Sequence, residues 1–128
     1  MTIRPFRPSD ADACWRMLVS EGVRGEDMHF LEGITGILDE EGVRGFFTLE
    51  MVDGFPHLRH LCVARAYRRV DRARRLIQAV RTVVCRSGST QMLVHAKQEH
   101  ITRLIRYYFR TAAYQRTVEG DSLYLVEA

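Results

Sequence analysis

Lysine is almost absent from this chain of 128 residues: eighteen of its nineteen basic residues are arginine, and the exception is Lys97. Long apolar runs are missing too, because the uninterrupted apolar stretches extend over only a few residues, whereas a membrane-spanning helix needs about 20. The opening, MTIRPFRPSD, has neither a hydrophobic signal core nor the arginine-rich, acid-free pattern of a transit peptide. These absences predict a cytoplasmic protein that has no membrane segment.

Cysteine is scarce, and the motifs of several enzyme classes are missing. Cys14, Cys62 and Cys85 are odd in number, widely spaced and flanked by apolar residues, which favours reduced, partly buried thiols over a disulfide or a metal site. No set of His, Cys or carboxylate residues has metal-ligand spacing, and neither a Gly-x-x-x-x-Gly-Lys loop nor a Gly-x-Ser-x-Gly elbow occurs. We therefore expect no metal and find no support for those enzyme classes.

Charge is present in quantity and is unevenly distributed along the chain. Residues 10–53 carry eleven acids and three arginines, a local net charge of −8, whereas residues 59–116 carry a local net charge of +12. Six arginines and one aspartate fall within residues 65–75 alone. An acidic end and a basic end suit an anionic ligand, a nucleic acid or a charged neighbour in an assembly, and the alternative is a solvated basic helix face.

Hydrophobic periodicity predicts a chain of alternating strands and helices. Helices are expected from Ser9 or Asp10 to Gly22, over residues 26–40, 71–86 and 98–111, and strands over residues 2–8, 43–52, 57–64, 90–96, 114–118 and 122–127. Asp53-Gly54 marks a hairpin between two of the strands. Within 26–40, Gly33 and Gly36 each weaken a helix by about 1 kcal/mol relative to Ala, so this element is expected to be short or broken. The order βαα-ββ-αβ-αββ predicts one α+β domain over residues 1–128, with a mixed central sheet flanked by helices.

The order of elements and three segments of sequence resemble the GNAT superfamily of N-acetyltransferases, and this resemblance extends over nearly the full chain. MTIRPFRPSDADAC is similar to the family's opening strand and first helix, residues 57–77 to its acyl-CoA motif, and residues 103–114 to its closing helix and the Gly-Phe that follows. The resemblance implies a GNAT-like fold and a place for acetyl-CoA. In the family, the strand aligned with residues 58–63 pairs through its backbone with the pantetheine arm, which assigns Leu61, Cys62 and Val63 to cofactor binding.

The turn after that strand departs from the family pattern. The family's Arg/Gln-x-x-Gly-x-Gly/Ala, whose amides hold the pyrophosphate at a helix N-terminus, falls on Arg68, Arg69, Val70, Asp71, Arg72 and Ala73. Asp71 replaces the central glycine. A carboxylate about 5 Å from a phosphate charge opposes binding by roughly 3 kcal/mol at an effective dielectric of about 20. Because Asp is also a good N-cap, we expect Asp71 to cap the helix in place of the pyrophosphate, leaving the nearby arginines free for another anion.

The catalytic positions depart from the family as well. The tyrosine that acts as general acid in the family aligns with Phe109, which has no proton to donate, and Tyr108 next to it lies on the predicted apolar face. A general base would have to come from four residues on the central strands: Glu50, His57, His60 and His95. His57 is the best of these, because many relatives have an acidic residue at this position.

Three functions remain open at this point. The favoured hypothesis is a GNAT-like protein with a degraded acetyl-CoA site and no cofactor, acting as a structural component of a larger assembly such as a phage virion. The alternative is an active acetyl-CoA-dependent N-acetyltransferase that acts on an unidentified amine. The third is a non-specific nucleic-acid binder that contacts phosphates through the arginines of residues 65–75.

Overall fold

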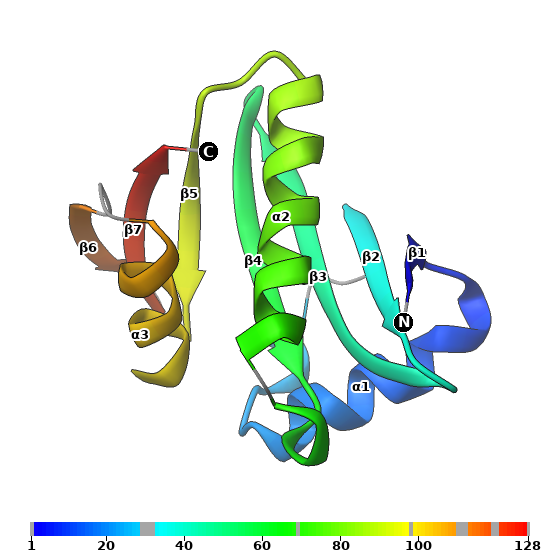
Figure 1. The fold of residues 1–128 in the computed structure, drawn as a ribbon. Helices are drawn as coiled ribbons and strands as arrows, with labels where there is room; N and C mark the ends of the chain where they lie inside the picture. The colour runs from blue at the N-terminus through cyan, green and yellow to red at the C-terminus, as the bar shows by residue number, and fades with distance from the viewer. Residues whose placement is uncertain are drawn as a thin grey trace.

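The structure is a computed structural model that describes residues 2–28, 33–68, 70–97, 99–109, 113–118 and 121–127. Within these ranges the strands are β1 (Thr2–Pro5), β2 (Ile34–Asp39), β3 (Val43–Val52), β4 (Phe55–Val63), β5 (Gln91–Ala96), β6 (Ala113–Val118) and β7 (Asp121–Glu127). The helices are α1 (Ala11–Ser20), α2 (Val70–Arg86) and α3 (Glu99–Tyr108), with short 3-10 turns η1 (Pro8–Asp10), η2 (Gly25–Asp27) and η3 (Arg65–Tyr67). Figure 1 shows α2 running along the central strands and α3 lying beside it near β5.

The strands form one seven-stranded sheet in the order β1-β2-β3-β4-β5-β7-β6. β4 and β5 are parallel, whereas every other neighbouring pair is antiparallel. α2 is the crossover between the two parallel strands, as such a connection requires. The mixed α+β architecture expected from the order of elements is therefore confirmed.

The expected helix over residues 26–40 is wrong. η2 occupies part of this stretch, and Ile34–Asp39 forms β2, which pairs with both β1 and β3. Gly36 lies opposite Phe47, and a Cβ atom on Gly36 would approach the Phe47 ring to 2.3 Å. The glycines weakened the helix, and hydrogen bonding to strands on both sides decided the conformation, as tertiary context often does.

The helices divide the core between the two faces of the sheet. Alternate residues of a strand point to opposite faces, and on β4 the side chains of Leu61 and Val63 join the larger core cluster with α2 and α3. Cys62 points the other way, into a smaller cluster with Cys14 and Leu18 of α1. The middle of β4 is therefore enclosed by helices from both sides.

The start of α1 is held by a buried ion-pair cluster. Asp10 directly precedes α1, where a cap was expected, but its carboxylate makes no capping hydrogen bond to that helix. It accepts hydrogen bonds from both terminal nitrogens of Arg4, at 2.8 and 2.9 Å, and from the Arg7 backbone N–H at 2.7 Å. Arg4 also donates to Asp39 at 2.8 Å, and its hydrogen bond lowers the pKa of Asp10. This cluster joins β1, β2 and the start of α1.

Two local expectations have clear outcomes. The Asp53-Gly54 hairpin is confirmed, since both residues have the positive φ angles, 51° and 79°, that a tight turn of this type requires. The three cysteines are free thiols; Cys14 and Cys62 are buried, but Cys85 is exposed rather than partly buried.

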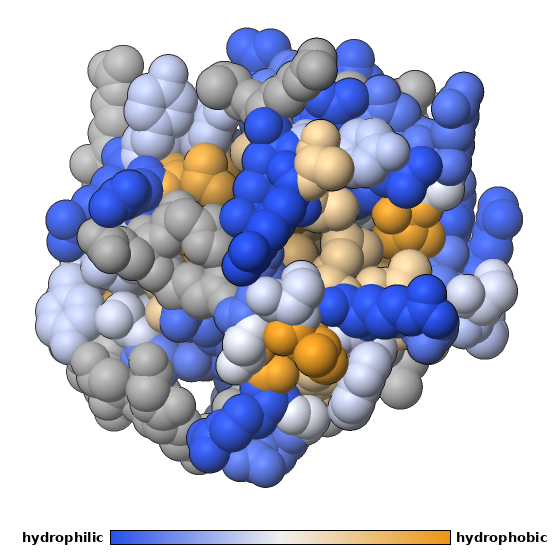
Figure 2. Space-filling view, turned by 90° about the horizontal axis from the view of Figure 1, so that it is seen from below, coloured by the Kyte–Doolittle hydropathy of each residue, from blue (hydrophilic) through white to orange (hydrophobic). Residues whose placement is uncertain are grey.

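The end of the molecule that carries α1 and the turn into α2 is mostly polar. Figure 2 views it from below and shows hydrophilic side chains over most of the face, with hydrophobic ones in separate smaller patches. None of the described helices combines the length and the apolar character needed to cross a bilayer.

Candidate functional site

The central feature of the site is the divergence of β4 and β5. The two strands pair only where His57 faces Leu93 and Leu58 faces Val94. β4 then continues to Val63 and β5 to Ala96 without further pairing between them. The edge of β4 that faces β5 therefore carries backbone groups that a neighbouring strand does not engage.

A β-bulge lies at the point of divergence. Along the β3–β4 ladder, Thr48 pairs with His60 and Leu49 pairs with Leu58, so Arg59 is the extra residue. Bulges re-aim side chains and increase the local twist of a strand. This one sends both Arg59 and His60 to the pocket described next.

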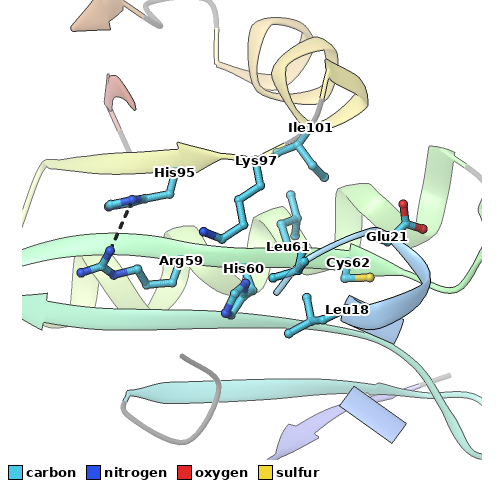
Figure 3. A pocket seen from close by; sticks show the side chains of 10 residues that line it. Leu18, Glu21, Arg59, His60, Leu61, Cys62, His95, Lys97 and Ile101 are labelled. Atoms are coloured by element: carbon cyan, nitrogen blue, oxygen red, sulfur yellow. Dashed lines mark hydrogen bonds between the residues drawn. The ribbon is translucent and has the colours of Figure 1, made fainter. Parts of the chain in front are cut away.

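A pocket of about 350 Å³, including its open mouth, fills the space between the diverging strands. Its lining comes from α1 and the loop after it (Leu18, Glu21, Val23), β4 (Arg59, His60, Leu61, Cys62), β5 and the following residue (His95, Lys97), and α3 (Ile101). Figure 3 shows His95 and Arg59 at one end and Glu21 at the other, with Leu61, Lys97 and Ile101 between them. The pocket thus has two polar ends and a partly apolar middle.

The histidine end is a hydrogen-bonded cluster built across three strands. Nδ1 of His57 lies 2.9 Å from Nε2 of His95. Arg59 reaches Nδ1 of His95 at 3.4 Å and donates from Nε to Glu50 at 3.0 Å. Burial lowers the pKa of His57, and the neighbouring His95 and Arg59 lower it further. His57 is therefore neutral near pH 7 and can accept a proton.

Asp121 joins the histidine cluster to Lys97, which lines the middle of the pocket. Lys97 Nζ donates to Asp121 at 2.6 Å, and the same carboxylate oxygen lies 3.7 Å from Nδ1 of His95. Burial acts to raise the pKa of Asp121, but hydrogen bonds from His95 and Lys97 outweigh it and hold this pKa below its usual range. Asp121 is thus an anion beside the histidine pair.

The opposite end of the pocket is formed by an arginine-carboxylate cluster. Arg65 and Arg68, in the turn that leads to α2, both pair with Oε1 of Glu21. Arg68 also donates from Nε to the Val63 carbonyl at 3.0 Å, which ties the turn to the end of β4. Two guanidinium groups therefore converge on one carboxylate where the pocket meets the turn.

Arg72, on the first turn of α2, has a carboxylate partner as well. Its Nε and Nη2 donate to Glu40 at 2.8 and 2.7 Å in a bidentate pair, and its side chain is only 11% exposed. The expectation that the arginines near Asp71 are free for another anion is therefore wrong for Arg65, Arg68 and Arg72. Carboxylates of the acidic N-terminal part of the chain neutralise them.

Asp71 does not cap α2. The helix begins at Val70, so Asp71 is its second residue, and its side chain is exposed. Arg69, also assigned to the cofactor turn, lies outside the described residues, and Ala73 is buried against the fold.

Of the three cofactor residues expected on β4, Leu61 and Cys62 line the pocket and Val63 lies at its arginine end. Burial raises the pKa of the Cys62 thiol to about 12, so this thiol is protonated and is not a nucleophile near pH 7. These positions can hold a ligand through apolar contact and the β4 backbone.

The tyrosine and phenylalanine of the closing helix belong to the core. Phe109 is 2% exposed, and the Arg81 guanidinium lies 4.4 Å from the centre of its ring. Tyr108 packs against the same cluster, and burial raises its pKa. Neither is among the described residues that line the pocket.

The structure also assigns residues that sequence reasoning missed. Glu21, Arg59, Lys97 and Asp121 took no part in the expected site, and His95 was one of the three candidate bases placed after His57. His57 and His95 are 38 positions apart and Glu21 and Arg68 are 47 apart, so only the fold brings each pair together. A signal existed for His95 alone, because it alternates with the apolar residues of a strand.

No protein-family model and no curated protein matches this sequence. Solved structures do match its fold. A GNAT family acetyltransferase from Staphylococcus aureus Mu50 superposes with a TM-score of 0.78 at 13% identity, over 98% of both chains. A GNAT family acetyltransferase from Elizabethkingia anophelis with acetyl-CoA bound gives 0.76 at 12% identity, over 99% of this chain and 97% of that one.

The PaiA N-acetyltransferase of Thermoplasma acidophilum, in complex with coenzyme A, gives 0.69 at 11% identity over the full length of both chains. At such low identity the likeness concerns the fold, and it extends over nearly the whole chain. Together with the mixed seven-stranded sheet and its diverging central strands, it establishes that this chain has the GNAT acetyltransferase fold.

Proposed function

We propose that this protein is an acetyl-CoA-dependent N-acetyltransferase that acts on an amine. The observation that carries the proposal is the pocket between β4 and β5, where the part of β4 that does not pair with β5 faces a partly apolar space. A pantetheine arm is a chain of methylene groups and two amides, so it needs an apolar channel and backbone hydrogen-bonding partners. The divergence of the two strands offers both.

The ends of the pocket fit the two ends of such a donor. Leu61 and Ile101 would contact the pantetheine arm, and Arg65 and Arg68 lie where β4 ends and could pair with its phosphates. Structures with acetyl-CoA or CoA bound to the same fold, those from E. anophelis and T. acidophilum, support this assignment. Because Arg68 already has a carboxylate partner, phosphate binding would require that partner to be exchanged.

In this reaction the C–N bond to the amine forms, the C–S bond of the thioester breaks, and the chain takes a proton from the amine. That proton balances the charge of the leaving coenzyme A thiolate, which is released as the thiol. The pair His57 and His95 suits this role: His95 lines the pocket, and His57, which is not among the described lining residues, contacts it at 2.9 Å. When His57 donates from Nδ1 to His95 and His95 donates from Nδ1 toward Asp121, Nε2 of His57 has a free lone pair. In this tautomer Nδ1 of His95 carries a proton, so it does not accept a hydrogen bond from Arg59. A proton accepted there is stabilised through His95 by the negative charge of Asp121.

Binding and turnover test the proposal directly. Calorimetry with acetyl-CoA should give a micromolar Kd for the wild type. Val23→Trp, which fills the pocket, should weaken binding by at least about tenfold. Val19→Trp is the matched control, because Val19 is 52% exposed on α1 and does not line the pocket. With an amine panel, thiol release from acetyl-CoA should follow, whereas absence of binding at millimolar acetyl-CoA would overturn the proposal.

A second candidate is a non-catalytic component of a larger assembly, such as a virion. It is favoured by Phe109, which cannot donate a proton to a leaving thiolate, and by the internal carboxylate partners of Arg68 and Arg72. Under this proposal the purified protein co-fractionates with a large partner and releases no thiol with any amine. Measurable turnover would rule it out.

A further inference from the structure

We propose that Glu21 sets the affinity of the site for phosphate-bearing donors, because its carboxylate occupies the anion position between Arg65 and Arg68. The inference rests on the proposed function, since it concerns the donor of that reaction. It identifies a residue that determines specificity and lies at the opposite end of the pocket from His95 (Figure 3).

The first argument concerns where Glu21 lies. It is the C-cap residue of α1, and its side chain is only 9% exposed. A carboxylate is unfavourable at a helix C-terminus, where the macrodipole is negative, and burial adds a desolvation cost. Neither α1 nor the surrounding apolar residues favours an anion at this position. Arg65 and Arg68 place positive charge beside it.

The second argument concerns the geometry of those arginines. Arg65 and Arg68 come from one short turn and converge on a single oxygen atom, Oε1. Arg68 is oriented by its second hydrogen bond, from Nε to the Val63 carbonyl at 3.0 Å. Two converging guanidinium groups at the entrance to a helix are a typical phosphate-binding arrangement. Glu21 therefore holds in the free protein the place that a phosphate oxygen would take.

The third argument is that the pocket continues from this point. Glu21 lines the same pocket as Leu61 and Ile101, so a ligand that extends along the channel from the histidine end arrives at Glu21. A donor with phosphates must displace the carboxylate from Arg68, whereas a donor that lacks phosphates need not. Glu21 is thus expected to reduce the preference for acetyl-CoA over acetyl-pantetheine.

The test compares Glu21→Gln with the wild type for two donors, by calorimetry. Gln keeps the size of the side chain and removes its charge, so acetyl-CoA should bind on the order of tenfold more tightly, while acetyl-pantetheine should bind equally well to both proteins. The matched control is Glu26→Gln, since Glu26 pairs with Arg24 at 3.2 Å and is 69% exposed. This control should leave both affinities unchanged.

The outcomes separate this inference from the proposed function. If wild type and Glu21→Gln bind acetyl-CoA equally well, or the variant binds it less tightly, the role of Glu21 is overturned and the proposed function stands. If neither binds acetyl-CoA but the variant alone gains affinity for inorganic pyrophosphate, the role of Glu21 is supported and the proposed function fails. Should Glu21→Gln not fold, Glu21→Asp, which withdraws the carboxylate by one methylene, should change the affinities in the same direction.

Discussion

His57 is the residue whose surroundings most change its chemistry. It is partly buried beside His95 and Arg59, and burial is the largest of the influences that lower its pKa. An imidazole in this position resists protonation because its neighbours include a second imidazole and a guanidinium group. The same lowered pKa that keeps His57 neutral near pH 7 gives the protein a pH-dependent stability.

We expect the folded protein to lose stability as the pH falls below about 6.5, the ordinary pKa of histidine. Below that value the unfolded chain binds a proton at residue 57 that the folded chain resists, so the free energy of unfolding falls until the pH reaches the lowered folded pKa. For one proton the slope is at most about 1.4 kcal/mol per pH unit. His57→Gln should remove this part of the pH dependence.

Urea unfolding of both proteins at pH 7.5, 6 and 5 measures this difference. Titrating groups that are not in contact with residue 57 contribute alike to both proteins, so the comparison reports on His57 together with its partner His95. Equal slopes in wild type and variant would contradict the lowered pKa. Above pH 7, His57 is neutral in both the folded and the unfolded protein, so it adds no further pH dependence to the free energy of unfolding.

Among the elements, β2 depends most on a single close contact. Gly36 lies between β1 and β3, and its missing side chain leaves room for the ring of Phe47, which is 2% exposed. Thr35 and Thr48 add a buried hydroxyl pair at 2.8 Å on the same ladder. Residues of the neighbouring strand, rather than the propensities of 34–39, therefore make this segment a strand.

We expect Gly36→Ala to destabilise the protein by about 2 kcal/mol, because the new Cβ would overlap a ring that the core prevents from moving. Gly25→Ala is the matched control. Its Cβ would come no closer than 3.2 Å, to the end of the Trp15 side chain, which is 47% exposed and free to adjust. The urea midpoints of both variants check the prediction, and equal midpoints would show that β2 does not constrain the Phe47 ring.

For the whole molecule, the acidic and basic segments of the sequence largely pair with each other. The acidic segment before β3 and the basic segment after β4 meet in three dimensions, where Glu21 pairs with Arg68 and Glu40 pairs with Arg72. The charge asymmetry therefore does not by itself require an outside partner. It helps to hold α2 against the N-terminal half of the sheet.

A double-mutant cycle measures this contribution. Replacing Arg72 and Glu40 by Leu, singly and together, should give a coupling energy of about 1 to 2 kcal/mol, because the pair is bidentate and partly buried. The exposed pair of Arg24 and Glu26 serves as control and should give a coupling near zero. If the two pairs gave equal coupling energies, the Arg72–Glu40 pair would not help to hold α2 against the N-terminal half of the sheet.

Several parts of the fold follow from local sequence signals. The apolar periodicity of α2 and α3, the alternation in β5 and the Asp53-Gly54 turn are short-range features, so the sequence predicts them without knowledge of the partner elements. The stretch 34–39 could not be predicted this way, because Gly36 is favourable only beside Phe47. Asp71 was misassigned as a cap for a related reason: the helix begins one residue earlier, at Val70.

Outside residues 26–40, the sequence by itself determined the order of strands and helices, the central hairpin and the presence of an arginine-rich turn after β4. Only the tertiary structure decided that β4 and β5 diverge beyond Leu58, that His57 meets His95, and that Glu21 lies between Arg65 and Arg68. The physical reason is the separation along the chain over which each kind of interaction acts. Periodicity and turn chemistry act between neighbours in the chain, whereas a pocket and its ion pairs join residues that are distant in the sequence and are brought together by packing of the sheet and helices.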